Sequence, residues 1–185
     1  DVRELESVGS YVRLDNNDAL VSANFTRLEV VGSSLEIDSN DVLPELFFPS
    51  LLTVGTSLQI DYNYALTVLT VDSLVSVGSS FYFYANTVLT RLSARALESV
   101  GSAFSVRSNY ALTSITVDML GSIGGYVDVS SNSFLTVARF HALESTGSYV
   151  YIASNSLTDQ PRVSSNSRFC FAQIRALTLI EVRHT

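Results

Sequence analysis

Apolar and polar residues alternate along this chain in short bursts that return every 23 residues. Each burst holds two apolar residues two positions apart, such as Leu58 and Ile60 on either side of Gln59. A period of two over about five residues, rich in β-branched and aromatic types, predicts a short strand with one buried face. The apolar pairs of the predicted strands are Val12/Leu14, Leu35/Ile37, Leu58/Ile60, Phe81/Phe83, Phe104/Val106, Val127/Val129 and Val150/Ile152.

Leucine, glycine and asparagine form three columns in register with these strands. A glycine recurs at every 23rd position, with a leucine four positions before it and an asparagine eight positions after it. Such self-similarity is typical of a solenoid, in which each repeat forms one coil and stacks on its neighbours. We therefore expect an all-β, right-handed parallel β-solenoid of seven 23-residue coils, spaced about 4.8 Å apart. The columns are Leu5, Leu28, Leu51, Leu74, Leu97, Leu120 and Leu143; Gly9, Gly32, Gly55, Gly78, Gly101, Gly124 and Gly147; and Asn17, Asn40, Asn63, Asn86, Asn109, Asn132 and Asn155.

The constant 23-residue spacing of these columns indicates that their residues form the scaffold. A buried asparagine has one carbonyl acceptor and two N–H donors, which can satisfy backbone groups that lose their sheet partners where the coil turns inward. Each glycine is interpreted as a tight bend that needs either a positive φ or a close approach of another backbone segment. The serines that follow the glycines, such as Ser10 and Ser79, are interpreted as turn hydroxyls and not as nucleophiles.

The chain is predicted to be one domain over residues 1–185, with coils over 5–165 and a cap over 166–185. The register predicts a glycine at position 170, where the sequence has Cys170, and Phe171, Ile174 and Leu177 then follow at helical spacing. We therefore expect a short C-terminal helical cap. No comparable cap precedes Leu5, so the first coil should expose apolar surface and a strand edge, to be covered by upstream sequence or by a neighbouring chain. The start at Asp1, without an initiator methionine or a signal-peptide pattern, suggests a fragment of a longer protein.

Composition excludes several classes of function. The 185 residues include 11 basic and 18 acidic residues, a net charge of −7, and every basic residue is arginine, so a nucleic-acid binder is not expected. The longest stretch without charge, Ser73–Thr90, is interrupted by Ser, Gly, Asn and Thr, which argues against membrane insertion. The single cysteine, Cys170, cannot form a disulfide framework within the chain, and His141 and His184 are too few for a histidine metal cluster. No cofactor is expected.

Side chains at the outward positions of the main strands are the candidates for function, because the scaffold does not need them. The last four coils carry a tyrosine-rich set there, and tyrosine suits contact with a protein or a sugar ring. The competing interpretation is that tyrosine has a high strand propensity and simply packs along exposed strands. The ligand-binding candidates are Tyr82, Tyr84, Arg107, Tyr126, Tyr149 and Tyr151.

Two other outward columns allow further hypotheses. Asp15, Asp38 and Asp61 are expected to stack at the strand ends, where they form weak candidates for a Ca²⁺ site or, with still less support, a glycosidase-like acid pair. The commoner explanation is a solvated turn edge. A threonine row permits an ice-binding face as a minor alternative, although threonine is ordinary in parallel strands. This row consists of Thr67, Thr90, Thr113 and Thr136, with Thr70 and Thr116 beside it.

One repeat carries the motif Leu51, Thr53, Val54, Gly55, Leu58, Ile60, Asn63, Ala65, Leu66, Thr67 and Leu69. This motif resembles the leucine-rich repeat of receptor L domains, the family of insulin-receptor and epidermal-growth-factor-receptor L domains and of GPI-anchored fungal cell-wall proteins. Asn166–Ile174 is similar to the Asn-x-x-Leu-Cys-x-x-x-Ile segment that often closes such domains. Two departures make a growth-factor receptor unexpected: Cys170 has no second cysteine, and these repeats are far more regular.

The resemblance implies a secreted or surface-anchored protein, and it carries over no ligand-contacting residue. In that setting Asn24-Phe25-Thr26 is an N-glycosylation sequon with Asn24 as the acceptor. We expect a non-enzymatic extracellular recognition or adhesion module that binds protein or glycan on its sheet face. The alternative is a structural subunit of a cell wall, surface layer or appendage, in which chains self-associate through the N-terminal coil.

Overall fold

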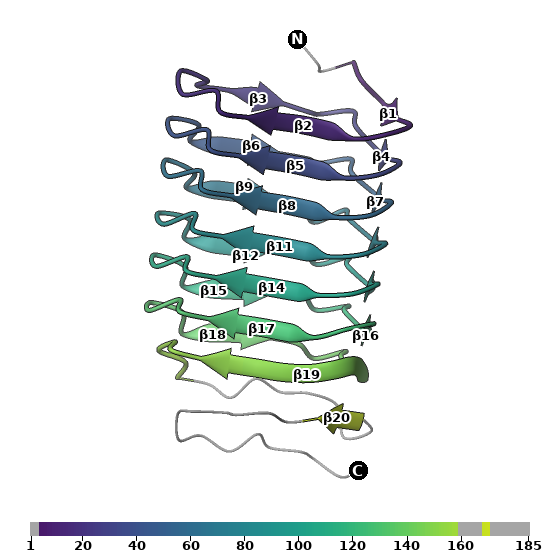
Figure 1. Ribbon diagram of the computed structural model, residues 1–185, viewed down its shortest axis with the longest axis vertical. Coiled ribbons are helices and arrows are strands. Elements are labelled where there is room, and N and C mark those ends of the chain that lie inside the picture. Colours follow the sequence, from purple (N-terminus) through teal and green to yellow (C-terminus); the bar gives the residue numbers. More distant parts are fainter. Residues whose placement is uncertain (1–3, 159–167, 171–185) are drawn as a thin grey trace.

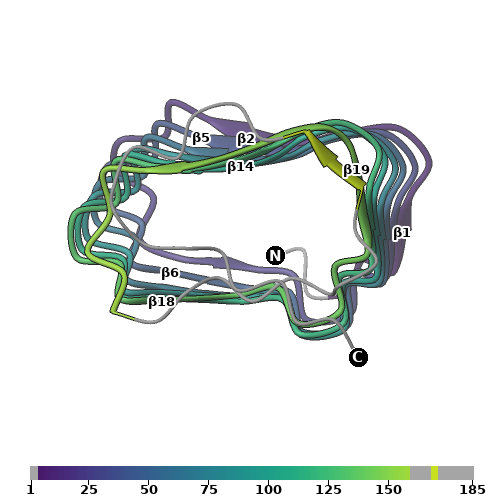
Figure 2. The same ribbon diagram turned by 90° about the horizontal axis from the view of Figure 1, so that it is seen from below.

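The computed structural model describes residues 4–158 and 168–170, and this part of the chain is all-β. It forms a right-handed solenoid of parallel strands, in which successive coils stack along the long axis (Figure 1). Seen along that axis, each coil is a flattened ring with a sheet on each long side and a column of short strands at one end (Figure 2). The predicted fold class is confirmed. No helix in the described residues is long and apolar enough to cross a membrane.

Each full coil contributes one strand to each of three columns. The short column is β1 (Ser7–Val8), β4 (Val30–Val31), β7 (Thr53–Val54), β10 (Ser76–Val77), β13 (Ser99–Val100) and β16 (Ser122–Ile123). The main column, which faces the viewer in Figure 1, is β2 (Val12–Asp15), β5 (Leu35–Asp38), β8 (Leu58–Asp61), β11 (Phe81–Tyr84), β14 (Phe104–Arg107) and β17 (Val127–Ser130). The opposite column is β3 (Ala23–Asn24), β6 (Glu45–Phe47), β9 (Val68–Thr70), β12 (Arg91–Ser93), β15 (Ser114–Thr116) and β18 (Val137–Arg139).

The last described coil joins two of these columns. Its strand β19 (Ser145–Ala153) pairs with β16 at its beginning and with β17 at its end, so one bent strand continues both the short and the main column. Of the predicted cap, the structure describes only Arg168–Cys170, which forms strand β20 parallel to β19. The cap was predicted to be helical, so Phe169 and Cys170 differ from the prediction, and the rest of the predicted helix lies outside the described residues.

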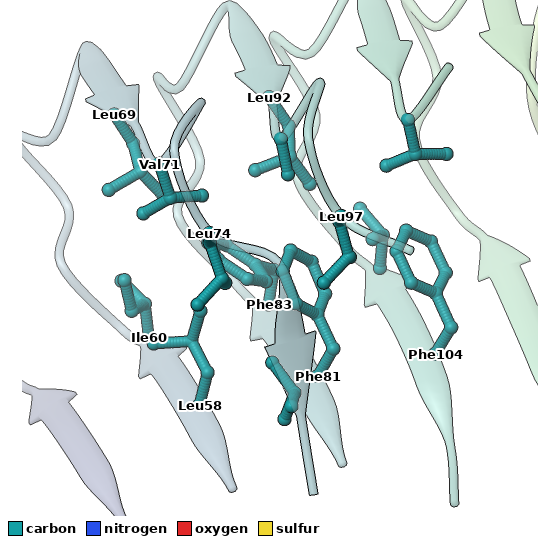
Figure 3. Packing of buried hydrophobic residues seen from close by; sticks show 14 of the residues in the cluster. Leu58, Ile60, Leu69, Val71, Leu74, Phe81, Phe83, Leu92, Leu97 and Phe104 are labelled. Atoms are coloured by element: carbon teal, nitrogen blue, oxygen red, sulfur yellow. The ribbon is translucent and has the colours of Figure 1, made fainter. Parts of the chain in front are cut away.

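Pairing between coils follows the 23-residue repeat. Leu35 pairs with Leu58 and Phe81 with Phe104, and every other pairing up to β19 has the same parallel register. The apolar pairs of the main strands therefore stack on themselves inside the coil, as Figure 3 shows for Leu58, Phe81 and Phe104. The rings of Phe81 and Phe104 are stacked, with centroids 4.9 Å apart.

The core is a single column that fills the solenoid. The inward residues of the second to sixth coils are almost fully buried, including the leucine column from Leu28 to Leu120. In the first coil the equivalent residues Leu5, Val8, Val12 and Leu14 are only partly buried. A coil thus needs neighbours on both sides to bury its apolar residues, as the repeat predicts.

The asparagine column acts as predicted. The Asn63 side chain donates to the carbonyl oxygen of Ile37 in the preceding coil at 2.9 Å and to that of Asp61 in its own coil at 2.8 Å. Its amide oxygen accepts the backbone N–H of Asn40 at 3.1 Å. The column therefore links each coil to both neighbours, and Asn40, Asn63, Asn86, Asn109 and Asn132 are fully buried.

The glycine column is explained by close backbone approach and not by positive φ, since no described glycine has a positive φ. A Cβ at Gly101 would lie 2.0 Å from the carbonyl oxygen of Gly78, whereas one at Gly9, which has no coil before it, would meet nothing within 4 Å. Positive φ falls instead on the residue directly before each column asparagine. These residues are Asn16, Ser39, Tyr62, Ala85, Ser108, Ser131 and Ser154.

Candidate functional site

The outward face of the main column carries the candidate site. Each coil presents three outward side chains on its main strand or directly before it, and the pairing places equivalent positions of successive coils side by side. The face is acidic over β2, β5 and β8 and rich in tyrosine from β11 to β19. We call this surface the main face.

A cluster of three tyrosines lies on the C-terminal half of the main face. The rings of Tyr126 and Tyr149 are stacked, with centroids 5.0 Å apart and an angle of 9° between their planes. Tyr126 also interacts with the Tyr82 side chain, and this interaction, together with partial burial and the nearby charges, raises the pKa of Tyr126 to about 12. The phenol of Tyr126 is therefore neutral at physiological pH, and the interaction with Tyr82 engages its single O–H group.

This contact crosses a whole coil, because the residues between the two tyrosines are small. Tyr82 lies on β11 and Tyr126 precedes β17, and the intervening β14 coil presents Ala103 and Ser105 on the main face. Both small residues are buried, Ala103 completely. Ala103 and Ser105 therefore occupy outward positions of the alternation but are not accessible on this surface.

An ion pair lies beside the tyrosine cluster. Arg107 Nε lies 3.5 Å from Asp128 Oδ2, and the Ser130 hydroxyl donates to Asp128 Oδ1 at 2.6 Å. Asp128 is only 8% exposed, while the Arg107 side chain is 53% exposed. Tyr151 is the register partner of Asp128 on the next strand and is half-buried. The guanidinium of Arg107 therefore stands out on the surface, anchored by a buried carboxylate.

Tyr84 belongs to a second aromatic group, apart from the first. Its ring packs edge-on against Tyr62 at a centroid distance of 5.1 Å, and Tyr62 in turn meets Tyr64 edge-on at 6.5 Å. Tyr62 and Tyr64 lie on the turn after β8 and were not among the sequence candidates. Because they lie on the turn, beyond the alternating part of the strand, a search limited to outward strand residues does not find them.

The predicted aspartate column is formed, with Asp15, Asp38 and Asp61 as register neighbours. Asp61 is 7% exposed, and its Oδ1 accepts the backbone N–H of Tyr84 at 2.8 Å while Gln59 donates to Oδ2 at 2.8 Å. Burial raises the pKa of Asp61 to about 6, against the opposing effect of these hydrogen bonds. Within the described residues no three acidic, histidine or cysteine side chains are grouped so that they could hold a metal ion.

The threonine row has a structural use. Each hydroxyl donates across one coil to a backbone carbonyl oxygen, from Thr67 to Pro44 at 3.1 Å, from Thr113 to Thr90 at 2.9 Å and from Thr136 to Thr113 at 3.2 Å. The hydroxyls therefore extend the hydrogen bonding between coils. The sequon acceptor Asn24 is exposed on β3, away from the main face.

A shallow groove of about 420 Å³ runs along the glycine column from the β10 coil to β19. Its floor includes Gly78, Gly101 and Gly124, and none of its lining residues is charged. The missing side chains are required by the close stacking of these glycines, so the groove is explained as a by-product of coil stacking.

In comparisons with known proteins, no family model, no curated protein and no solved structure matches this chain. The geometry defines its class as a parallel β-solenoid repeat protein with an aromatic and acidic main face.

Proposed function

We propose that this chain is a non-enzymatic recognition module that binds a protein or glycan ligand on its main face. The observation that carries the proposal is the tyrosine cluster of Tyr82, Tyr126 and Tyr149. Tyrosine combines a large apolar ring with a polar hydroxyl, and such residues dominate the binding energy of many interfaces.

The rigidity of this cluster supports the proposal. A side chain that is already fixed by stacking loses little conformational entropy on binding. Arg107, held by Asp128, adds a fixed charged donor next to the rings. The main face thus offers aromatic, hydroxyl and guanidinium groups in one preorganised array.

An extracellular location belongs to the same proposal. It is supported by the resemblance of the repeat to receptor L domains and by the exposed acceptor of the Asn24 sequon. The same resemblance favours a cell-surface setting for the ligand.

The test removes rings from the main face. We expect Tyr126→Ala/Tyr149→Ala/Tyr151→Ala to weaken binding to the ligands found on a glycan array and a synthetic peptide array by about tenfold or more. The matched control is Tyr110→Ala/Phe134→Ala, which removes two exposed aromatic residues from turns outside the main face. Equal binding by both variants would overturn the proposal.

A second candidate is a structural subunit that assembles through its first coil. It is favoured by the partial exposure of Val8, Val12 and Leu14, whose counterparts in the next coil are fully buried. Sedimentation analysis should then show concentration-dependent oligomers that Val12→Glu/Leu14→Glu abolishes. A monomer at every concentration would exclude this function for the chain.

A further inference from the structure

The main face carries few positive charges, and each of them is already paired with a carboxylate of the same face. Its outward strand positions hold two arginines, Arg13 and Arg107, against five carboxylates. Arg13 Nε lies 3.2 Å from Asp15 Oδ1 and 3.8 Å from Glu36 Oε2, while Arg107 pairs with Asp128. The five carboxylates are Asp15, Glu36, Asp38, Asp61 and Asp128.

Two adjacent carboxylates are left without a cationic partner among the described residues. Asp38 and Asp61 are register neighbours on β5 and β8, and neither forms an ion pair there. Asp38 Oδ1 is buried and has no hydrogen-bond partner in the described structure. A buried carboxylate oxygen of this kind is costly unless a donor or a cation reaches it. The exposed Asp18 and Asp41 add further negative charge on the turns after β2 and β5.

Aromatic rings adjoin this unpaired charge. Tyr84 is the register partner of Asp61 on β11, and Tyr62 follows Asp61 directly on the turn. A guanidinium or ammonium group is attracted both to a tyrosine ring face and to a carboxylate. Inorganic cations fit less well, because the carboxylates follow one another in a row across coils and do not converge on a point.

We propose that the partner of the main face is a basic polypeptide segment, whose arginine or lysine side chains engage the Asp38–Asp61 row and the neighbouring tyrosines. This inference rests on the proposed recognition function and narrows its ligand to one of the two classes. Charge complementarity gives such an interface its specificity and a fast association rate.

The experiment measures binding of the purified chain to a synthetic dodecapeptide of alternating arginine and serine. The control peptide has glutamine in place of arginine, and cellohexaose serves as a neutral glycan. We expect only the arginine peptide to bind, with an affinity that falls about fivefold or more between low and physiological salt, because screening acts on exposed charges.

Variants locate the contact. Asp38→Asn/Asp61→Asn should weaken peptide binding by about fivefold to tenfold, the effect of losing two partly screened ion pairs. Glu98→Gln/Glu144→Gln has the same change in net charge, but its two exposed sites flank β13 and β19 outside the main face, and it should bind as the parent does. If the first variant does not fold, as thermal melting would show, Glu36→Gln/Asp38→Asn replaces it.

The outcomes separate this inference from the proposed function. Equal binding of the arginine peptide by both charge variants, or equal binding of the arginine and glutamine peptides, overturns the inference. Binding of cellohexaose but not of the arginine peptide, lost in the tyrosine variant, overturns the inference and leaves the proposed function standing. A tyrosine variant that binds every probe as the parent does overturns both.

Discussion

At the scale of single residues, each buried side chain of the asparagine column both donates a hydrogen bond to the backbone and accepts one from it. The Asn86 side chain donates to the Ile60 carbonyl oxygen of the preceding coil at 2.7 Å, and its amide oxygen accepts the Asn63 backbone N–H at 3.1 Å. One buried side chain therefore satisfies an acceptor and a donor of the backbone. No apolar residue of similar size can do this.

Asn86→Leu should therefore be strongly destabilising. The substitution leaves the Ile60 carbonyl and the Asn63 N–H unpaired in a dry interior, and each such group costs about 1–3 kcal/mol. We expect the free energy of unfolding in urea to fall by about 2–5 kcal/mol. Asn24→Leu, at an exposed strand position, is the control and should change it by about 0.5 kcal/mol or less. Similar losses in the two variants would contradict the assigned role.

Asp61 predicts a pH dependence of stability. Its pKa is about 6 in the folded chain and 3.8 when unperturbed, so the folded state binds the proton more tightly than the unfolded state does. The contribution of Asp61 is thus most favourable below about pH 4 and is lost as the pH rises from 4 to 6. Asp61→Asn keeps an oxygen for the Tyr84 N–H and removes the charge.

Urea unfolding at pH 4 and pH 7 measures this effect. Relative to Asp61→Asn, the parent chain should lose about 1–2 kcal/mol of stability between the two pH values, less than the full shift implies because solvent screens the charge in part. Other carboxylates titrate in both proteins and cancel in the comparison. A parent and variant with the same pH profile would refute the prediction.

Which residues meet on the main face was predictable only in part. The tyrosines were located because alternation marks outward positions. The interaction between Tyr82 and Tyr126 was not predictable, because it depends on Ala103 and Ser105 lying between them and on rotamers that a sequence pattern does not specify. The burial of Asp128 has the same origin, since the Ser130 and Arg107 contacts come from neighbouring positions in three dimensions.

At the scale of elements, the turn between the short and the main strand depends on contact between successive glycines. In each turn after the first, the glycine lies so close to the carbonyl oxygen of the previous glycine that a Cβ would overlap it, at 2.1 Å for Gly55 and 1.9 Å for Gly147. The main strands were predictable, because apolar residues alternate over each of them, whereas the short and opposite strands, such as β1 (Ser7–Val8) and β3 (Ala23–Asn24), were not predicted. The positive φ before each asparagine was not, because Asn16, Tyr62 and Ala85 share no side-chain feature that would signal it.

Gly101→Ala tests the glycine contact within one turn. The new methyl group would force β13 and β14 away from the coil that contains Gly78, and overpacking of this kind costs about 1–3 kcal/mol or more. Gly9→Ala introduces the same residue in the same turn of the first coil, where space is open, and should change the stability by about 0.5 kcal/mol or less. Thermal melting of both variants compares them directly. Equal melting temperatures would show that the turn accommodates the methyl group.

At the scale of the whole molecule, stability is expected to come from contacts between adjacent coils. All strand pairing up to β19 joins a residue to the one 23 positions away, so no coil bonds to a distant one through its strands. The sequence predicted the stack of coils and its main column, because three residue columns and the apolar pairs share one period, but it predicted one strand per coil where the structure has three. The sequence of the C-terminal segment departs from that period, so the repeat no longer predicts strands there.

Removal of one whole repeat should leave a folded protein. Deletion of Thr87–Asn109 joins Asn86 to Tyr110 and restores the register on both sides. We expect a β-type circular dichroism spectrum and cooperative melting at a lower temperature, because one interface between coils is lost. Deletion of Thr87–Glu98, about half a repeat, places polar residues in the core and should abolish cooperative melting. Cooperative folding of the second variant, or its absence in the first, would contradict the nearest-neighbour description.

Because its coils are equivalent, the main face can be lengthened during evolution one coil at a time. Each coil adds one row of three outward side chains, while the inward residues of that coil match those of any neighbour. A tandem in-frame duplication of a single repeat therefore lengthens the main face by one row, and the inward residues of the added coil pack on the existing core. Selection can then vary that row alone, so the repertoire of ligands grows by copying and editing, and the scaffold is inherited unchanged.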